Sequence, residues 1–193
     1  MLNKKFKDHT IILASGSPRR QQFLKDLGLE FIIKTKDIEE IYPKYLHGKE
    51  ITSYLAQLKA SAFEDELKEN EILITADTIV RFNGKVMGKP KDKNDAKKML
   101  NELSGQAHEV ISSICIKTIN KQIIINDTTD VYFKELTNDE IDYYVNNFKP
   151  FDKAGAYGIQ EWLGFIAVKK IKGSYFNVMG FPVHKFYKEM MDL

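Results

Sequence analysis

The feature of this sequence that most constrains its fold is the alternation of strand-like and helix-like segments along the chain. Short runs of apolar and β-branched residues alternate with segments in which apolar residues recur every three or four positions. This alternation is typical of α/β proteins, in which helices cover the faces of a sheet. No Ser/Gly/Pro-rich linker and no internal repeat divide the chain, so we expect a single domain over residues 1–193.

The expected elements follow from apolar periodicity and from turn and cap residues. The expected strands are Ile11–Ala14, Phe31–Thr35, Glu71–Ala76, Glu109–Thr118, Gln122–Phe133 and Phe165–Ile171, with a hairpin over Ile79–Val86 turning at Asn83-Gly84. The expected helices start after Ser17 and cover Thr52–Lys68, Asp95–Leu103, Thr137–Asn147 and Pro182–Met191. Because only a short connection separates the two long strands, Glu109–Thr118 and Gln122–Phe133, they should pair antiparallel. The sheet should therefore be mixed.

Charge and hydropathy exclude several classes of protein. With 29 basic and 27 acidic residues the net charge is +2, which does not support a dedicated binder of polymeric nucleic acid. No apolar run approaches the roughly 20 residues that span a bilayer, or the roughly 7–15 of a signal-peptide core. The single cysteine, Cys115, cannot form an internal disulfide and fits a buried position in a reducing compartment. We therefore expect a cytoplasmic protein that has no membrane partner.

A strand-to-helix turn near the N-terminus is the first candidate binding site. Ser15-Gly16-Ser17-Pro18-Arg19-Arg20 joins the first strand to the first helix. Helix N-termini attract phosphates through unpaired N–H groups and the helix dipole, and arginine can bind two phosphate oxygens at once. The alternative is a capped surface helix with exposed arginines.

Carboxylates form the second candidate set. Asp77 is expected at the end of a buried strand, and Glu40 belongs to the acidic stretch Asp37-Ile38-Glu39-Glu40 in a polar loop. Such groups can bind Mg²⁺ or Mn²⁺, and Asp77 could also accept a proton from water. Alternatively, Asp77 begins a turn and the acidic stretch is a solvated loop.

Two lysines and one glutamine complete the candidates. Lys59 lies among apolar helix residues, so it either extends to solvent or points into a cleft. Lys89, in Gly88-Lys89-Pro90, is either a fixed charge beside phosphates or a solvated side chain; the P-loop pattern is absent. Gln160 ends a glycine-containing loop and could read the edge of a base, unless the loop is only a tight turn packed by Tyr157.

Taken together, the motifs resemble those of the Maf family of nucleoside triphosphate pyrophosphatases, in the same order along nearly the whole chain. The matching blocks are Leu13-Ala14-Ser15-Gly16-Ser17-Pro18-Arg19-Arg20, Asp37-Ile38-Glu39-Glu40, Leu58-Lys59-Ala60, Ala76-Asp77-Thr78, Gly88-Lys89-Pro90, Leu103-Ser104-Gly105 with His108 and Val110, Asp152-Lys153-Ala154-Gly155-Ala156-Tyr157-Gly158-Ile159-Gln160, and Gly173-Ser174-Tyr175-Phe176-Asn177-Val178 followed by Gly180 and Pro182. The chain departs from the family pattern at Glu161 and Trp162, where smaller residues are frequent.

The resemblance implies a fold and a reaction. The fold would be an elongated α/β fold with a mixed sheet and two lobes flanking a central cleft, similar to that of the inosine triphosphate pyrophosphatases. The reaction would be hydrolysis of a nucleoside triphosphate to the monophosphate and pyrophosphate with Mg²⁺ or Mn²⁺, a form of nucleotide-pool house-cleaning. The resemblance also implies a homodimer. The alternatives are the same chemistry on modified or purine nucleotides and a non-catalytic nucleotide-binding regulator of cell division and septum formation.

Residue roles follow from the same resemblance. Ser15, Arg19 and Arg20 would hold the triphosphate. Glu40 and Asp77 would bind the metal, with Asp77 as the proposed base, and Lys59 and Lys89 would neutralise phosphate charge. The form of the block that ends in Gln160 resembles the subgroup that prefers dTTP and UTP.

Overall fold

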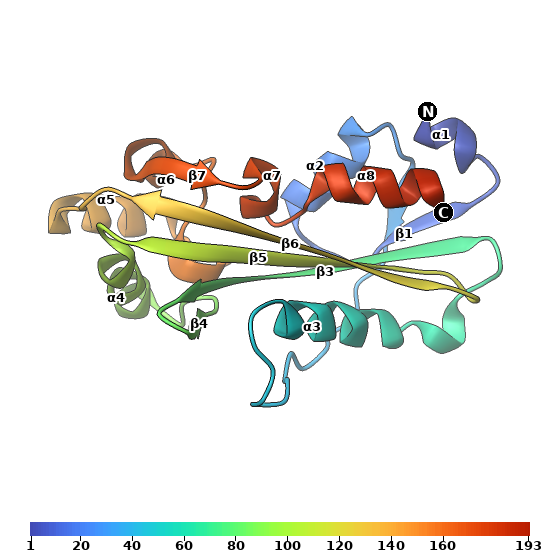
Figure 1. Cartoon of the computed structure of the whole chain (residues 1–193), viewed down its shortest axis with the longest axis horizontal. Coiled ribbons are helices and arrows are strands. Elements are labelled where there is room, and N and C mark those ends of the chain that lie inside the picture. The colour runs from blue at the N-terminus through green and yellow to red at the C-terminus, as the bar shows by residue number, and fades with distance from the viewer. The chain divides into compact units, whose positions relative to one another are not determined.

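The computed structural model describes all residues from 1 to 193 as alternating strands and helices (Figure 1). The strands are β1 (Thr10–Leu13), β2 (Phe31–Ile33), β3 (Glu71–Phe82), β4 (Lys85–Met87), β5 (Ala107–Lys117), β6 (Gln122–Phe133) and β7 (Val168–Lys172). The α-helices are α1 (Leu2–Lys5), α2 (Pro18–Asp26), α3 (Lys49–Ser61), α4 (Lys93–Leu103), α5 (Asn138–Phe148), α6 (Trp162–Ala167), α7 (Tyr175–Val178) and α8 (Val183–Asp192). Two 3₁₀ turns, η1 (Glu64–Glu66) and η2 (Ala154–Ala156), complete the structure.

The seven strands form one mixed sheet. Its order is β2-β1-β3-β5-β6-β7, and β4 pairs with β3. Strand β1 is parallel to both β2 and β3, whereas β3 pairs antiparallel with β4 and β6 pairs antiparallel with β7. Parallel neighbours require crossover connections, and the α2 and α3 segments provide them. The predicted α/β class and mixed sheet are confirmed.

The chain divides into two compact units, which we describe separately. Unit 1 comprises residues 1–77, 112–127 and 180–193, and unit 2 comprises residues 78–111 and 128–179. Three of the four boundaries fall within β3, β5 and β6, so each of these strands contributes residues to both units; the fourth lies between α7 and α8.

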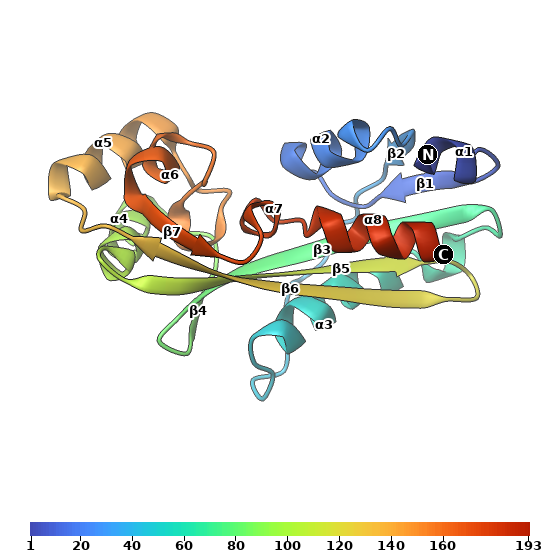
Figure 2. The same cartoon turned by 45° about the horizontal axis from the view of Figure 1, so that its top comes forward.

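In unit 1, α3 covers one face of the strands, and α2 and α8 lie on the other (Figures 1 and 2). The hydroxyl of Thr75 on β3 donates to the carbonyl of Ala56 on α3 at 2.6 Å, which satisfies a buried polar group. On the opposite face, the ring of Phe181 packs against Phe23 of α2 and Phe186 of α8. Both faces of the strands are therefore buried, which explains the continuous apolar runs in β1 and β3.

In unit 2, helices α4, α5 and α6 pack over a core that includes Leu100, Tyr144 and Leu163, all fully buried. Helix α5 begins with the capping box predicted from the sequence: the Thr137 hydroxyl accepts from the N–H of Glu140, and the Glu140 carboxylate accepts from the N–H of Thr137. The predicted hairpin turn at Asn83-Gly84 is also present.

Three predicted elements need correction. Strand β3 is one continuous strand to Phe82 rather than a strand ending at Ala76, because Ile79 and Val80, which point to opposite faces, are both buried. Helix α3 begins three residues earlier than predicted and stops at Ser61, because the N–H of buried Phe63 bonds to the carbonyl of Ala60 in a tight 3₁₀ turn.

The third correction concerns the predicted strand Phe165–Ile171, which is a helix up to Ala167 and a strand only from Val168. Leu163 and Ala167, four residues apart, are both fully buried on one side of α6, so tertiary packing selects the helix. None of the helices in the structure combines the length and the apolar character needed to cross a bilayer.

Candidate active site

The loop between β1 and α2 is organised around the hydroxyl of Ser15. Ser15 is buried, and its Oγ accepts hydrogen bonds from the N–H of Ser17 and from Nη1 of Arg20, both at 3.3 Å. Ser17 is the N-cap residue, as predicted, but its side chain makes no capping bond, and Pro18 is the first residue of α2. Around Gly16, a Cβ atom would meet no neighbour within 4 Å, so the backbone there is open to a ligand.

Arg20 connects this loop to two other segments of unit 1. Its Nη1 donates to the carbonyl of Ala76 on β3 at 2.8 Å, and its Nε donates to the carbonyl of Gly180 at 3.1 Å. Burial lowers the pKa of Arg20 below its ordinary value, an effect that the nearby carboxylate of Asp77 opposes. The two hydrogen bonds fix the guanidinium in position beside the carboxylate of Asp77. The positive charge of Arg19 is also close enough to affect the pKa of Arg20.

Lys59, Asp77 and Glu40 meet at one point in unit 1. The ammonium of Lys59 on α3 lies 2.6 Å from Oδ1 of Asp77 on β3 and 3.0 Å from Oε1 of Glu40 in the loop after β2. Asp77 is buried, whereas Glu40 is exposed. The prediction that Asp77 lies at a strand end is wrong: it lies within β3, where the charge of Lys59 compensates its burial. The side chain of Lys59 therefore points inward to these carboxylates and does not extend to solvent.

The two carboxylates fit the divalent cation that the resemblance implies. Both have an oxygen within hydrogen-bonding distance of the same ammonium, so these two oxygens converge on one positively charged group. Mg²⁺ is commonly held by one or two carboxylates together with water and substrate phosphates. No cluster of three or more histidine, cysteine, aspartate or glutamate side chains able to hold a metal is present.

The other two predicted residues, Lys89 and Gln160, belong to unit 2 and have exposed side chains. Lys89 follows Gly88, whose carbonyl accepts a hydrogen bond of 3.1 Å from the N–H of Gly155 in η2. Gln160 lies in the turn before α6. Tyr157 is buried in the same loop, so the loop is both a packed turn and the carrier of an exposed amide.

Some polar partners in these loops carry little or no signal in the sequence. The acceptors for Arg20 at Ala76 and Gly180 are backbone carbonyls, which any residue could supply. In unit 2, the buried Lys153 pairs with Glu161, which follows Gln160 directly. The sequence shows a charged residue on each side of the glycine-containing loop, Lys153 before it and Glu161 after it. Only the fold shows that the two side chains form an ion pair.

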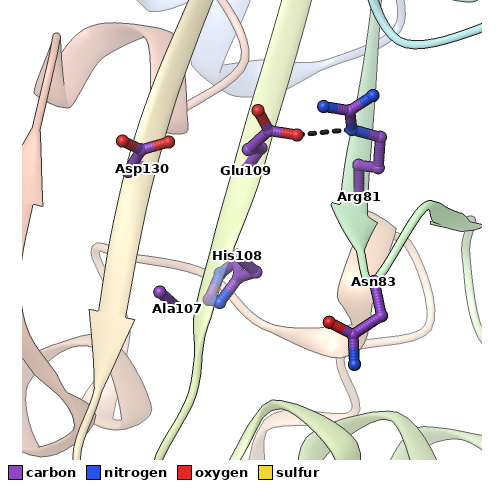
Figure 3. A pocket seen from close by; sticks show the side chains of 6 residues that line it. All are labelled: Arg81, Asn83, Ala107, His108, Glu109 and Asp130. Atoms are coloured by element: carbon purple, nitrogen blue, oxygen red, sulfur yellow. Dashed lines mark hydrogen bonds and ion pairs between the residues drawn. The ribbon is translucent and has the colours of Figure 1, made fainter.

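Unit 2 also contains a cavity of about 210 Å³ that none of the predicted site residues lines (Figure 3). Its lining residues are Arg81, Asn83, Ala107, His108, Glu109 and Asp130. Arg81 donates through Nε to the Glu109 carboxylate, so the two charges on the cavity wall are paired. His108 is nearly fully buried; its ring packs against Phe133 and Tyr157, and its Nε2 lies 2.8 Å from the Tyr157 hydroxyl. These contacts indicate a structural role for the histidine.

Comparison with solved structures first defines the fold. The Ham1 protein of Staphylococcus aureus matches with a TM-score of 0.53, over 93% of this chain and 99% of that one, at 18% sequence identity. This is a likeness of fold alone, and it agrees with the mixed α/β sheet described above.

Comparison of sequences then gives the family. The family model described as Maf-like protein matches residues 10–193, so the chain belongs to the Maf family, as the motif order predicted. It is 58% identical to the dTTP/UTP pyrophosphatase of Flavobacterium johnsoniae over the whole of both chains. It is 53% identical to the dTTP/UTP pyrophosphatase of Christiangramia forsetii over 100% of this chain and 98% of that one, and 50% identical to that of Phocaeicola vulgatus over 96% of each.

Proposed function

We propose that this protein is a metal-dependent nucleoside triphosphate pyrophosphatase that hydrolyses dTTP and UTP to the monophosphate and pyrophosphate. The observation that carries the proposal is the convergence of Lys59, Asp77 and Glu40, because these groups would supply a base, a fixed positive charge and oxygen ligands for a metal. The full-length relatives named dTTP/UTP pyrophosphatase support it further.

The loop before α2 would bind the phosphates. Its open backbone at Gly16, the Ser15 hydroxyl and the start of α2 suit an anion. Arg19 and Arg20 would add charge-assisted hydrogen bonds, with Arg20 held in place by the carbonyls of unit 1. Phosphoryl transfer depends mainly on positioning and charge neutralisation, which these groups provide.

Asp77 would act as the base that removes a proton from the attacking water. Its burial and its contact with Lys59 fix its carboxylate in one place, as general-base catalysis requires. Lys59 would neutralise negative charge beside it. Glu40 and Asp77 are the residues that would hold Mg²⁺ or Mn²⁺, which when bound neutralises phosphate charge and orients the phosphate for in-line attack.

Lys89 and Gln160 would act from unit 2. Lys89 would neutralise charge on the phosphates, and Gln160 would bind the base edge through its amide donor and acceptor. This role for both residues requires that residues 1–193 act as a single functional domain. We further propose a cytoplasmic homodimer with no polymeric nucleic acid as partner.

A nucleotide panel tests the proposal. Purified protein would be incubated with Mg²⁺ or Mn²⁺ and each of dTTP, UTP, dCTP, dATP, dGTP and modified triphosphates, and the products separated by chromatography. We expect monophosphate and pyrophosphate from dTTP and UTP. Faster turnover of purine or modified nucleotides would show that those are the preferred substrates. Tight binding without turnover would instead support a non-catalytic regulator of cell division.

A further inference from the structure

The carboxylate of Glu161 joins three segments of unit 2 around the turn that carries Gln160. Its Oε1 lies 2.8 Å from the ammonium of Lys153, and its Oε2 accepts a hydrogen bond from the hydroxyl of Tyr144 on α5. The Tyr144 hydroxyl in turn accepts from the N–H of Gly158 at 3.0 Å. The turn is closed by a hydrogen bond from the Glu161 N–H to the Gly158 carbonyl, also at 3.0 Å.

This cluster is buried enough to be energetically significant. The side chain of Lys153 is 10% exposed and that of Glu161 is 25% exposed. Burial, followed by the hydrogen bond to Glu161, raises the pKa of Tyr144 above its ordinary value, so its hydroxyl keeps its proton and remains a donor. Loss of the carboxylate would leave a buried hydroxyl without its acceptor and a mostly buried ammonium with fewer partners.

The absence of a side chain at Gly158 leaves room for the carboxylate of Glu161. A Cβ atom at Gly158 would come within 2.8 Å of the Glu161 carboxyl carbon, so only glycine allows this approach. Gln160 itself is exposed, so its placement depends on the backbone on either side, which Gly158 and Glu161 fix.

We propose that Glu161 is a positioning residue that sets the orientation of Gln160 and thereby the preference of the enzyme for dTTP and UTP. The proposal rests on the proposed function, in which Gln160 contacts the base. Without the Glu161 carboxylate, the turn would sample other backbone conformations. Selectivity among bases would then decrease, whereas the phosphate site of unit 1 would be unchanged.

The test compares Glu161→Gln and Glu161→Ala with the wild-type protein. Steady-state kcat and KM would be measured for dTTP, UTP and dCTP. In Glu161→Ala we expect KM for dTTP and UTP to rise about tenfold and their preference over dCTP to fall by a similar factor, with kcat changed less than about threefold. Glu161→Gln, which keeps the shape of the side chain, should lie between.

The matched control is Asp142→Asn, which breaks the exposed ion pair of Lys97 and Asp142 in the same unit and should leave selectivity unchanged. Amide hydrogen exchange provides a readout that does not depend on activity: exchange at Gly158 should be about tenfold faster in Glu161→Ala. Folding is checked by thermal unfolding of each variant.

Three outcomes decide the matter. A folded Glu161→Ala variant with wild-type preference among the three nucleotides would overturn the proposal. An equal loss of kcat for all three nucleotides would also overturn it, because that pattern indicates damage to the chemistry rather than to base recognition. A wild-type protein that hydrolyses neither dTTP nor UTP would overturn the proposed function itself, and the selectivity role of Glu161 with it.

Discussion

The ammonium of Lys59 lies 2.6 Å from Oδ1 of Asp77, which joins helix α3 to the middle of strand β3. Asp77 is buried, and its charge is compensated by this contact and by the nearby guanidinium of Arg20. Because a carboxylate without a partner would be costly at this position, the pair fixes the proposed base and makes it dependent on its neighbour.

Asp77→Asn should reduce kcat for dTTP by about 10²–10⁴-fold, the contribution typical of a general base. The substitution keeps the shape of the side chain, and Lys59 retains Glu40 as a partner, so the variant should remain folded. The measurement is kcat together with the thermal unfolding midpoint. The control is Asp26→Asn, at an exposed carboxylate that bonds to Gln22. Near-normal turnover by folded Asp77→Asn would remove Asp77 as the base.

Removal of divalent metal with a chelator should abolish turnover and leave the fold intact. Glu40→Gln should raise the Mg²⁺ concentration required for half-maximal activity by about 10–100-fold, because one of the two proposed carboxylate ligands loses its charge. Activity titrated against Mg²⁺ measures this, with Glu39→Gln as the neighbouring exposed control. An unchanged metal requirement in Glu40→Gln would exclude Glu40 as a ligand.

Gly164→Ala should prevent stable folding of unit 2 or destabilise it by roughly 3–5 kcal/mol. A Cβ atom there would lie 2.1 Å from the carbonyl oxygen of Ile159, and a backbone atom cannot move aside cheaply. Gly88→Ala is the control, because a Cβ at that position meets nothing within 4 Å and should change stability by less than about 0.5 kcal/mol. Urea unfolding of both variants measures the difference; equal stabilities would contradict the close approach.

The stability of the protein should fall between pH 6.5 and pH 4 because of His108. Burial lowers the pKa of His108 from 6.5 to about 4, so in this range the unfolded chain binds a proton that the folded chain does not. The contribution is complete above pH 6.5 and is lost progressively as the pH falls towards 4, amounting to roughly 3 kcal/mol.

Urea unfolding of the wild type and of His108→Gln at pH 7.5 and pH 5 isolates this contribution. The loss of stability on acidification should be smaller in His108→Gln than in the wild type. In the control His184→Gln, at an exposed position, it should match the wild type. An equal loss in all three proteins would show that His108 does not cause it.

Cys115 should be unreactive in the folded protein. Its side chain is fully buried, and burial raises the pKa of the thiol to about 11, so little reactive thiolate is present at pH 8. Labelling with a thiol reagent should be at least about 100-fold slower in buffer than in urea, because it requires local opening. As Cys115 is the only cysteine, a rapid reaction of the native protein would contradict its burial.

Local sequence patterns were sufficient for much of the fold. The capping box at Thr137, the hairpin turn at Asn83-Gly84 and the start of α2 after Ser17 depend on neighbouring residues, and all are confirmed. Where packing between distant segments competes with local preference, prediction was wrong. The segment before Val168 is helical because Leu163 and Ala167 are buried on one side of it.

By itself the sequence determined the α/β class, the order of the motifs and the residue types of the site, because these depend on periodicity and on chemical groups. Only the tertiary structure decided which groups meet: that Lys59 points inward to Asp77 and Glu40, that Arg20 is held by the carbonyls of Ala76 and Gly180, and that Glu161 pairs with Lys153. The physical reason is that the geometry of these contacts is set by how the chain packs around the core, and not by the residues next to each group in the sequence.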